Sequence, residues 1–284
     1  MRKAVPIDNS LASFIQTLER THGLRIDAYD EVFLQKSIDK RLAETGIKTV
    51  SAYGEYLADN RAEAECFCQS LRINYSEFFR NSLTFALLEQ QILPALIAEK
   101  KQSGQKEIRI WSAGCAAGQE IWSVAILLDA LLTAKESLLS YRIFATDLSE
   151  SDLAKARAGI YSAEAVGNIC LKYLNSCFLR QGDAYVVVPR LLEQVDFSVY
   201  DLLDEHSVCP ADSLYGDFDL IFCCNLLFYY KPDVRQRVIG KIYRALSGSG
   251  FFVTGEAERD MVTKQEGFCP VAPAAAIFQK RGGK

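Results

Sequence analysis

From about Ile108 onward the chain alternates short, apolar, β-rich runs with helical stretches, and this alternation limits its possible folds more than any other feature. Apolar strands separated by helices are typical of a parallel sheet that is covered by helices on both faces. The predicted strands are Ile108–Ser112, Tyr141–Thr146, Val195–Val199, Phe218–Cys223 and Gly250–Thr254, and the predicted helices are 119–134, 149–157 and 232–246. We therefore predict an α/β fold, with Ala275–Gln279 adding a final antiparallel edge.

The first 70 residues follow a helical rather than a strand period. Leu11, Phe14, Ile15 and Leu18 share one helical face, and Leu34, Ile38 and Leu42 recur every four residues. A second irregular stretch interrupts the later alternation, with a hairpin predicted around Gly182-Asp183. We predict a helical domain at 1–72, a larger domain at 73–284, and a small antiparallel β insertion at 160–194.

Composition excludes several classes of protein. The chain has 284 residues, 49% of them hydrophobic, which supports a sizeable core and excludes global disorder. Its apolar runs are shorter than the roughly 20 residues of a membrane span, and the start turns polar too early for a signal peptide. A net charge of −4 gives no reason to expect nucleic-acid binding. We expect a soluble, cytoplasmic, globular protein without membrane insertion.

Nine cysteines stand out in this composition. They form no C-x-x-C pair, and only two histidines, His22 and His206, accompany them. Several lie in apolar runs, where a free thiol behaves as a small hydrophobe. We predict reduced thiols and no metal site.

The richest motif is the stretch from Ile108 to Ser123, in which a strand leads through Gly114 and Gly118 into a helix. Small residues let the backbone approach a ligand, and the helix N-terminus offers free N–H groups. Asp147 ends the next strand, where an acid can accept hydrogen bonds from a ribose diol. The loop matches neither G-x-G-x-x-G nor the P-loop, so S-adenosylmethionine (SAM) fits better than a dinucleotide. An ordinary tight turn followed by an unrelated Asp is the alternative.

Further motifs follow one another in a fixed order. They are Asn74-Tyr-Ser-Glu-Phe-Phe-Arg80, the glycine loop, Ala145-Thr-Asp147, Gly159-Ile-Tyr161, Val195-Asp-Phe, Asp201-Leu-Leu203, Phe222-Cys-Cys-Asn225-Leu-Leu-Phe-Tyr229 and Gly255-Glu256-Ala-Glu258. In this combination, over nearly the whole chain, the sequence resembles the CheR family of chemotaxis-receptor glutamate methyltransferases. The resemblance implies a Rossmann-like class I methyltransferase sheet with an N-terminal helical domain. It also implies SAM as cofactor and S-adenosylhomocysteine as product.

The resemblance assigns roles by position. Arg80 and Tyr229 match the family's catalytic positions, where they would orient the carboxylate and the cofactor. Asp147 matches the ribose-binding acid, and Asp201 and Leu202 match a pair at the adenine edge. The complete set of predicted cofactor-binding residues is Asn74, Ser76, Arg80, Gly114, Cys115, Gly118, Gln119, Asp147, Asp201, Leu202, Cys224 and Asn225.

Ser76 stands where the family usually has Thr, and Asp201 where it has Asn; three other departures from the family pattern matter more. Gln119 replaces a carboxylate expected to meet the cationic end of the cofactor, Cys224 replaces an Arg, and Asn81 replaces a Glu. Such changes fit an active protein-glutamate O-methyltransferase with a weaker cofactor contact. They also fit a catalytically weak SAM-binding signalling module, or a methyltransferase that acts on a protein other than a chemoreceptor.

The implied partner is the cytoplasmic helical domain of a chemoreceptor or a related signalling protein. The family recognises it with a basic helix, and here Lys36, Lys40 and Arg41 retain some positive charge. The hairpin loop 181–185 looks shorter than in members that dock a receptor's C-terminal pentapeptide by strand addition. We therefore expect a monomer that does not depend on such a tail.

Overall fold

The computed structural model describes residues 9–72, 75–134 and 138–281. These residues form two compact units. The first comprises the described residues up to 72 together with Phe228–Arg235, and the second comprises the described parts of Asn74–Leu227 and Gln236–Lys284.

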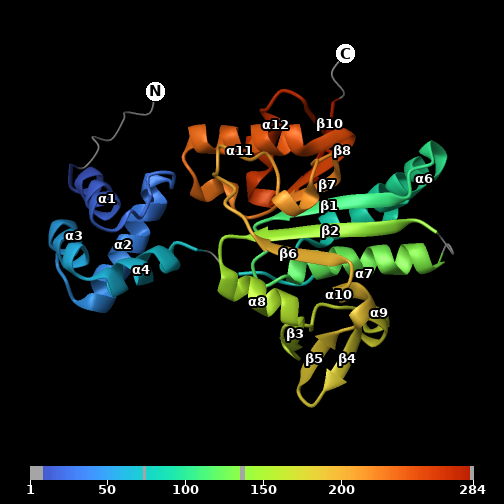
Figure 1. The fold of residues 1–284 in the computed structure, drawn as a ribbon, viewed down its shortest axis with the longest axis horizontal. Helices are drawn as coiled ribbons and strands as arrows, with labels where there is room; N and C mark the ends of the chain where they lie inside the picture. The colour runs from blue at the N-terminus through green and yellow to red at the C-terminus, as the bar shows by residue number, and fades with distance from the viewer. Residues whose placement is uncertain (1–8, 73–74, 135–137, 282–284) are drawn as a thin grey trace. The chain divides into compact units, whose positions relative to one another are not determined.

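The first unit is helical, as its sequence period predicts. Its helices are α1 (Asn9–His22), α2 (Glu31–Thr45), α3 (Val50–Asp59) and α4 (Arg61–Ser70) (Figure 1). Asp30 caps α2 by accepting hydrogen bonds from the N–H groups of Val32 and Phe33. Phe14 stacks on Tyr53 and meets Phe67 edge-on in a core where all three are buried.

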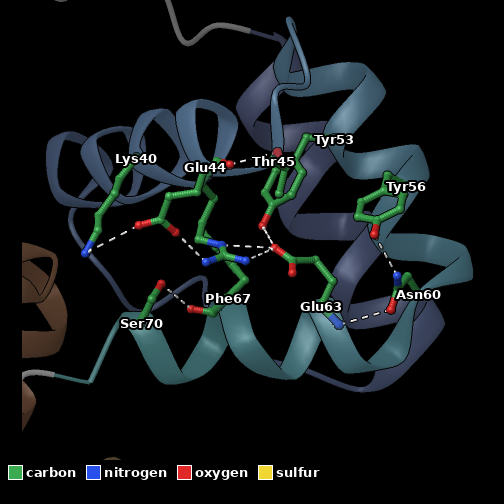
Figure 2. Close-up of polar contacts among 10 residues, drawn as sticks. Lys40, Glu44, Thr45, Tyr53, Tyr56, Asn60, Glu63, Phe67 and Ser70 are labelled. Atoms are coloured by element: carbon green, nitrogen blue, oxygen red, sulfur yellow. Dashed lines mark hydrogen bonds and ion pairs between the residues drawn. The ribbon is translucent and has the colours of Figure 1, made fainter.

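A half-buried ion pair also links these helices (Figure 2). The Arg41 guanidinium donates to Glu63 at 3.0 and 2.5 Å and to Glu44 at 2.5 Å, while the Tyr53 hydroxyl donates to Glu63 at 2.8 Å. Burial and the Glu63 carboxylate raise the pKa of Tyr53 above its ordinary value. The basic stretch predicted from the sequence is therefore smaller than expected, because Arg41 is half-buried and paired with Glu63 and Glu44, while Lys36 and Lys40 stay exposed.

The second unit is built on a sheet with strand order β6-β2-β1-β7-β8-β10-β9. Pairing is parallel from β6 to β8 and antiparallel for β10 and β9. The strands are β1 (Glu107–Ala113), β2 (Ser140–Asp147), β6 (Val195–Val199), β7 (Phe218–Cys223), β8 (Leu246–Thr254), β9 (Phe268–Pro270) and β10 (Ile277–Lys280). The predicted α/β class, with its strands and their central parallel pairing, is confirmed.

Helices cover both faces of this sheet, because successive strand residues point to opposite sides. On one face Ile110 and Ile143 pack with α5 (Ser82–Leu87), α6 (Leu93–Ser103) and α7 (Gln119–Ala134). On the other, Trp111 and Phe144 pack with α11 (Pro232–Ala245) and α12 (Arg259–Thr263). The shorter helical segments are the π-helix Leu88–Ile92 and the 3₁₀ turns Ala211–Ser213, Leu227–Tyr229 and Glu256–Glu258.

The C-terminal region differs from expectation in one respect. The segment 275–279 contributes β10, which is antiparallel as predicted, but β10 lies between β8 and β9 and is not the edge. The short strand β9 takes the edge, and Val271 to Ala276 turn the chain back between them. A three-residue strand with a proline at its end gives too weak a period to be recognised in the sequence.

A separate antiparallel sheet, in the order β3-β5-β4, interrupts the alternation. It comprises β3 (Ile160–Ser162), β4 (Phe178–Gln181) and β5 (Ala184–Val187), with α8 (Glu150–Ala158) before it and α9 (Leu171–Cys177) and α10 (Pro189–Leu192) around the hairpin (Figure 1). Gly182 turns the β4–β5 hairpin with a positive φ of 61°, as its position in the sequence predicts. Within the described ranges, no helix is long and apolar enough to span a membrane.

Candidate active site

The glycine loop turns sharply at the carboxyl end of β1. The N–H groups of Gly114 and Cys115 donate to the Thr146 carbonyl at 2.8 and 2.9 Å, so the loop is fixed to the end of β2. Positive φ angles at Gly114 (91°), Ala116 (47°) and Gly118 (89°) bend the chain into α7. The buried Cys115 thiol points at the Ala116 carbonyl, and burial raises its pKa well above the ordinary value.

Asp147 lies directly against this loop. Its Oδ2 accepts the Ala116 N–H at 2.9 Å, and its Oδ1 accepts the Ser149 N–H at 2.9 Å. Each carboxylate oxygen can accept a second hydrogen bond, so two acceptor sites remain. Asp147 is thus oriented by the backbone on both sides while keeping the capacity to bind a diol.

Gly118 is required by its surroundings. A Cβ atom there would lie 2.9 Å from the Ala156 Cβ and 3.2 Å from the Tyr161 hydroxyl, at a φ of 89°. The Tyr161 hydroxyl donates to the Ala117 carbonyl at 2.7 Å, which holds the loop from the β3 side. Spacing alone predicts no role for Tyr161, although it stands in the Gly159-Ile-Tyr161 motif.

The Phe78-Phe79-Arg80 segment is attached to the start of α7. Phe78 is buried edge-on against Tyr161 and Phe178. Phe79 has a positive φ of 52°, and its N–H donates to the Ser123 hydroxyl at 3.0 Å. That hydroxyl donates in turn to the Gln119 carbonyl at 2.7 Å. A bulky residue with positive φ is strained, and such strain persists where the surroundings enforce it.

Arg80 follows this strained residue and is exposed. Its guanidinium lies over the Tyr75 ring, 5.0 Å from the centroid, and donates to the Tyr75 carbonyl at 3.5 Å. Arg80 also lines a surface pocket of about 500 Å³ together with Phe79, Glu89, Asn168 and Tyr173. Ser76 is half-buried in the same segment, whereas Asn74 lies outside the described residues.

The first turn of α7 holds the least satisfied polar groups of the site. Gln119 Oε1 is buried and accepts no hydrogen bond from the part of the chain that the structure describes. The neighbouring Glu120 carboxylate accepts a long hydrogen bond, 3.3 Å, from the Ser112 hydroxyl and another from the Cys224 thiol. Burial raises the pKa of Glu120 from 4.5 to about 7; the Cys224 thiol, Ser112 and Arg80 oppose this shift, and Glu258 adds to it.

The end of β7 is organised around Glu258, which is fully buried. Its carboxylate accepts hydrogen bonds from the N–H groups of Asn225 (2.8 Å), Leu227 (2.6 Å) and Gly255 (2.9 Å), and from the Thr254 hydroxyl (2.8 Å). These bonds hold Asn225 in a left-handed conformation with a φ of 58°. In the sequence, Glu258 is marked only by its place in the Gly255-Glu256-Ala-Glu258 motif.

Cys224, just before Asn225, is half-buried, and its thiol lies 3.7 Å from the Val253 carbonyl. Burial and then the charge of Glu120 raise the pKa of Cys224 well above the ordinary value, so the thiol stays protonated. After β6, Asp201 Oδ1 accepts the Leu203 N–H at 2.8 Å, and Leu202 is buried against the sheet core. These loops follow the carboxyl ends of parallel strands, where such sheets bind ligands.

Tyr229 belongs to a different unit from the other predicted site residues. It belongs to the helical unit, where its ring lies 4.7 Å from that of Phe33 between centroids. Every other predicted position that the structure describes belongs to the second unit. No group of three metal-ligating side chains occurs within the described ranges, and the cysteines are free.

Comparison with known proteins adds to this geometry. Residues 74–274 match the family model described as "CheR methyltransferase, SAM binding domain", and residues 9–71 match "CheR methyltransferase, all-alpha domain". The chain belongs to the CheR methyltransferase family. As the resemblance implied, it is a SAM-dependent methyltransferase with a class I methyltransferase sheet.

Several curated CheR relatives are similar over most of their length. "Chemotaxis protein methyltransferase 1" of Vibrio cholerae is 32% identical over 259 residues, covering 88% of this chain and 89% of the relative. A protein of the same name from Pseudomonas aeruginosa is 30% identical, covering 85% and 86%. "Chemotaxis protein methyltransferase" of Borreliella burgdorferi is 28% identical, covering 88% of each.

The residues of this CheR protein fit SAM in three respects. Gln119 Oε1 is a buried acceptor without a partner among the described residues, at a helix start next to the glycine loop. Asp147 retains acceptor sites toward that loop. Gly114 and Gly118 have positive φ angles, and the loop that they turn leads into the N-terminus of α7, whose free N–H groups can face a ligand.

Proposed function

We propose that this protein methylates glutamate side chains of a chemoreceptor-like signalling protein in the cytoplasm, forming glutamyl methyl esters. The observation that carries the proposal is the buried, unpartnered Gln119 Oε1 at the start of α7, next to the glycine loop that Asp147 contacts, in a chain of the CheR family. The names of the curated relatives, which are chemotaxis protein methyltransferases, support the chemotactic context.

We assign the cofactor contacts as follows. Asp147 would accept from the ribose hydroxyls, and Gln119 and Glu120 would accept from the α-ammonium of SAM. Asp201, Leu202 and Asn225 would border the adenine. Gly114, Cys115 and Gly118 would line the loop against the cofactor, with Asn74, Ser76, Arg80 and Cys224 completing the surroundings.

The chemistry asks for positioning rather than for acid or base catalysis. A glutamate carboxylate is ionised at pH 7 and is its own nucleophile. When bound, SAM would supply an electrophilic methyl group on a positively charged sulfur; transfer to the glutamate carboxylate would form a C–O bond as the C–S bond breaks and its electron pair stays on sulfur. No proton moves, so Arg80 and Tyr229 need only hold the carboxylate in line with the methyl group.

The same proposal covers the rest of the protein. We assign a substrate-recognising helical domain to 1–72, a methyltransferase domain to 73–284, and a β insertion to 160–194. Lys36 and Lys40 are exposed on α2 and would meet the acidic methylation helix of a receptor. We further propose a monomer that works without a receptor C-terminal pentapeptide; measurable binding of such peptides to the β insertion would overturn that part.

Transfer of a radiolabelled methyl group from SAM to purified receptor cytoplasmic domains tests the proposal. We expect base-labile label on the receptor with the wild-type protein and at least about a hundredfold less with Arg80→Ala, since the guanidinium orients the reacting carboxylate. Cofactor binding without methyl esters on any receptor would support a catalytically weak signalling module. Label on a different signalling protein would replace the chemoreceptor as substrate.

A further inference from the structure

We propose that the helical unit positions the catalytic tyrosine: Phe33 and Asp30, at the start of α2, orient Tyr229 for methyl transfer. This inference rests on the role proposed for Tyr229 and extends it to residues with no predicted part in the reaction. It follows from how the segment Phe228–Arg235 is attached to the helical unit, of which it forms part.

The attachment begins with the backbone. The Asp30 N–H donates to the Tyr229 carbonyl at 2.8 Å, and the Lys231 N–H donates to the Ala28 carbonyl at 2.9 Å. Between them, Tyr29 and Tyr230 form an antiparallel β-bridge. Two backbone hydrogen bonds flanking one bridge fix the direction in which the Tyr229 side chain leaves the chain.

Aromatic packing then restricts the ring itself. The Tyr229 ring lies 4.7 Å from the Phe33 ring at 55° and 4.1 Å from the Phe228 ring at 51°. The next pair, Tyr29 and Tyr230, lies 5.5 Å apart. Aromatic pairs such as Tyr229–Phe33 attract each other beyond the effect of their buried area and prefer particular ring angles, which favours one orientation of the Tyr229 ring.

Arg235 completes the arrangement from the start of α11. It donates to the Tyr230 carbonyl at 2.7 Å and to the Phe228 carbonyl at 3.5 Å, so it holds the chain on both sides of Tyr229. Its guanidinium also lies 3.8 Å from the Asp30 carboxylate. Asp30 is at the same time the N-cap of α2, which links the start of the helix to the position of the tyrosine.

Phe33 and Lys36 lie one turn apart on α2, so the helix proposed to recognise the substrate also carries the residue that packs on Tyr229. Substrate contact and tyrosine orientation therefore depend on one rigid element. A loosened α2 start should lower kcat more than it weakens cofactor binding, because the proposed cofactor residues belong to the other unit.

The test compares Phe33→Leu with Tyr56→Leu, a second aromatic truncation on the same helical unit at an exposed position of α3. We expect Phe33→Leu to lower kcat about tenfold, as misplacement of a catalytic group does, with the Kd for S-adenosylhomocysteine unchanged. Phe33→Tyr should restore kcat, and Tyr56→Leu should leave it at the wild-type value. An unchanged kcat in a folded Phe33→Leu protein would overturn the inference.

A spectroscopic measurement separates this inference from the proposed function. In protein labelled with 3-fluorotyrosine, the ¹⁹F resonance that disappears in Tyr229→Phe reports the surroundings of Tyr229. We expect Phe33→Leu to shift this resonance and Tyr56→Leu to leave it in place; an unmoved resonance contradicts the positioning role. If the resonance moves but Tyr229→Phe retains full kcat, the positioning holds and the catalytic role of Tyr229 fails.

Discussion

Two glutamates serve the ends of neighbouring strands in the second unit, and their surroundings are opposite. Glu258 is fully buried and accepts four hydrogen bonds from three backbone N–H groups and one hydroxyl. Glu120 is half-buried and accepts only side-chain hydrogen bonds, from the Ser112 hydroxyl at 3.3 Å and from the Cys224 thiol, next to an unpartnered Gln119 oxygen. The fold itself supplies the hydrogen-bond donors of the Glu258 carboxylate. The Glu120 carboxylate keeps acceptor sites that remain open to a ligand.

This difference separates a structural role from a binding role. A buried carboxylate with four donors fixes the chain that supplies them, here the segment with Asn225. A carboxylate with few partners costs folding free energy, and a protein retains such a group where a ligand satisfies it. The contrast leads to four predictions: three substitutions, from the largest expected effect to the smallest, and one pH dependence.

Replacement of Glu258 should have the largest effect. Glu258→Ala leaves three N–H groups and a hydroxyl without their acceptor, and we expect it to lower the free energy of unfolding by about 3 kcal/mol or more. Urea unfolding followed by circular dichroism measures this change. Equal destabilisation by Glu120→Gln would remove the contrast between the two glutamates.

Crowding at the glycine loop should come next. Gly118→Ala brings a Cβ to 2.9 Å from Ala156 at a φ of 89°, so we expect the loop to shift and SAM affinity to fall about a hundredfold. Gly104→Ala is the matched control, since Gly104 has a similar φ of 72° with nothing within 4 Å. Calorimetric titration of both variants isolates crowding from backbone strain, and equal affinities would refute the close packing.

Glu120→Gln should spare stability and weaken binding. The amide keeps the shape of the side chain but loses the negative charge that would meet the cofactor ammonium, so we expect about tenfold weaker SAM binding at pH 8. Isothermal titration measures the Kd, and urea unfolding should show no loss of stability. Unaltered affinity would assign the ammonium to another residue.

The pH dependence of stability tests the same carboxylate without a ligand. Because the folded protein raises the pKa of Glu120 from 4.5 to about 7, the folded state binds a proton more tightly than the unfolded chain does. The Glu120 contribution should therefore lower the free energy of unfolding as pH rises from about 4.5 to about 7. Urea titrations of wild type and Glu120→Gln over this range should diverge, the wild type losing more; parallel curves would contradict the raised pKa.

Strand and helix positions were largely predictable because elements that are buried on both faces consist mostly of apolar residues, and such runs are visible in the sequence. The predicted Val195–Val199 and Phe218–Cys223 coincide with β6 and β7, and 119–134 coincides with α7. One local prediction was wrong: β9, and not β10, forms the edge of the sheet. Three residues with an internal cysteine and a final proline carry no period that distinguishes a strand from a loop.

The site divides in the same way. Asp147 and the glycine loop were found from the sequence because both lie at strand ends, and parallel strands bring their ends to one edge. The roles of Glu258 and Tyr161 could not be predicted in this way. Each side chain binds backbone groups that are distant in sequence, and no spacing rule encodes such contacts. Arg41 lies in the stretch that the sequence predicts to be a basic surface, but its guanidinium pairs with Glu44 and Glu63.

The sequence by itself determined the α/β class, the helical N-terminal region, the methyltransferase family and the loop that would hold SAM, because these depend on residue type, local period and ordered motifs. Only the tertiary structure decided which polar groups are satisfied. It gave Glu258 four donors, left Glu120 and Gln119 short of partners, and packed Tyr229 against Phe33. Hydrogen bonding and burial depend on which distant segments meet, and that information exists only after the chain has folded.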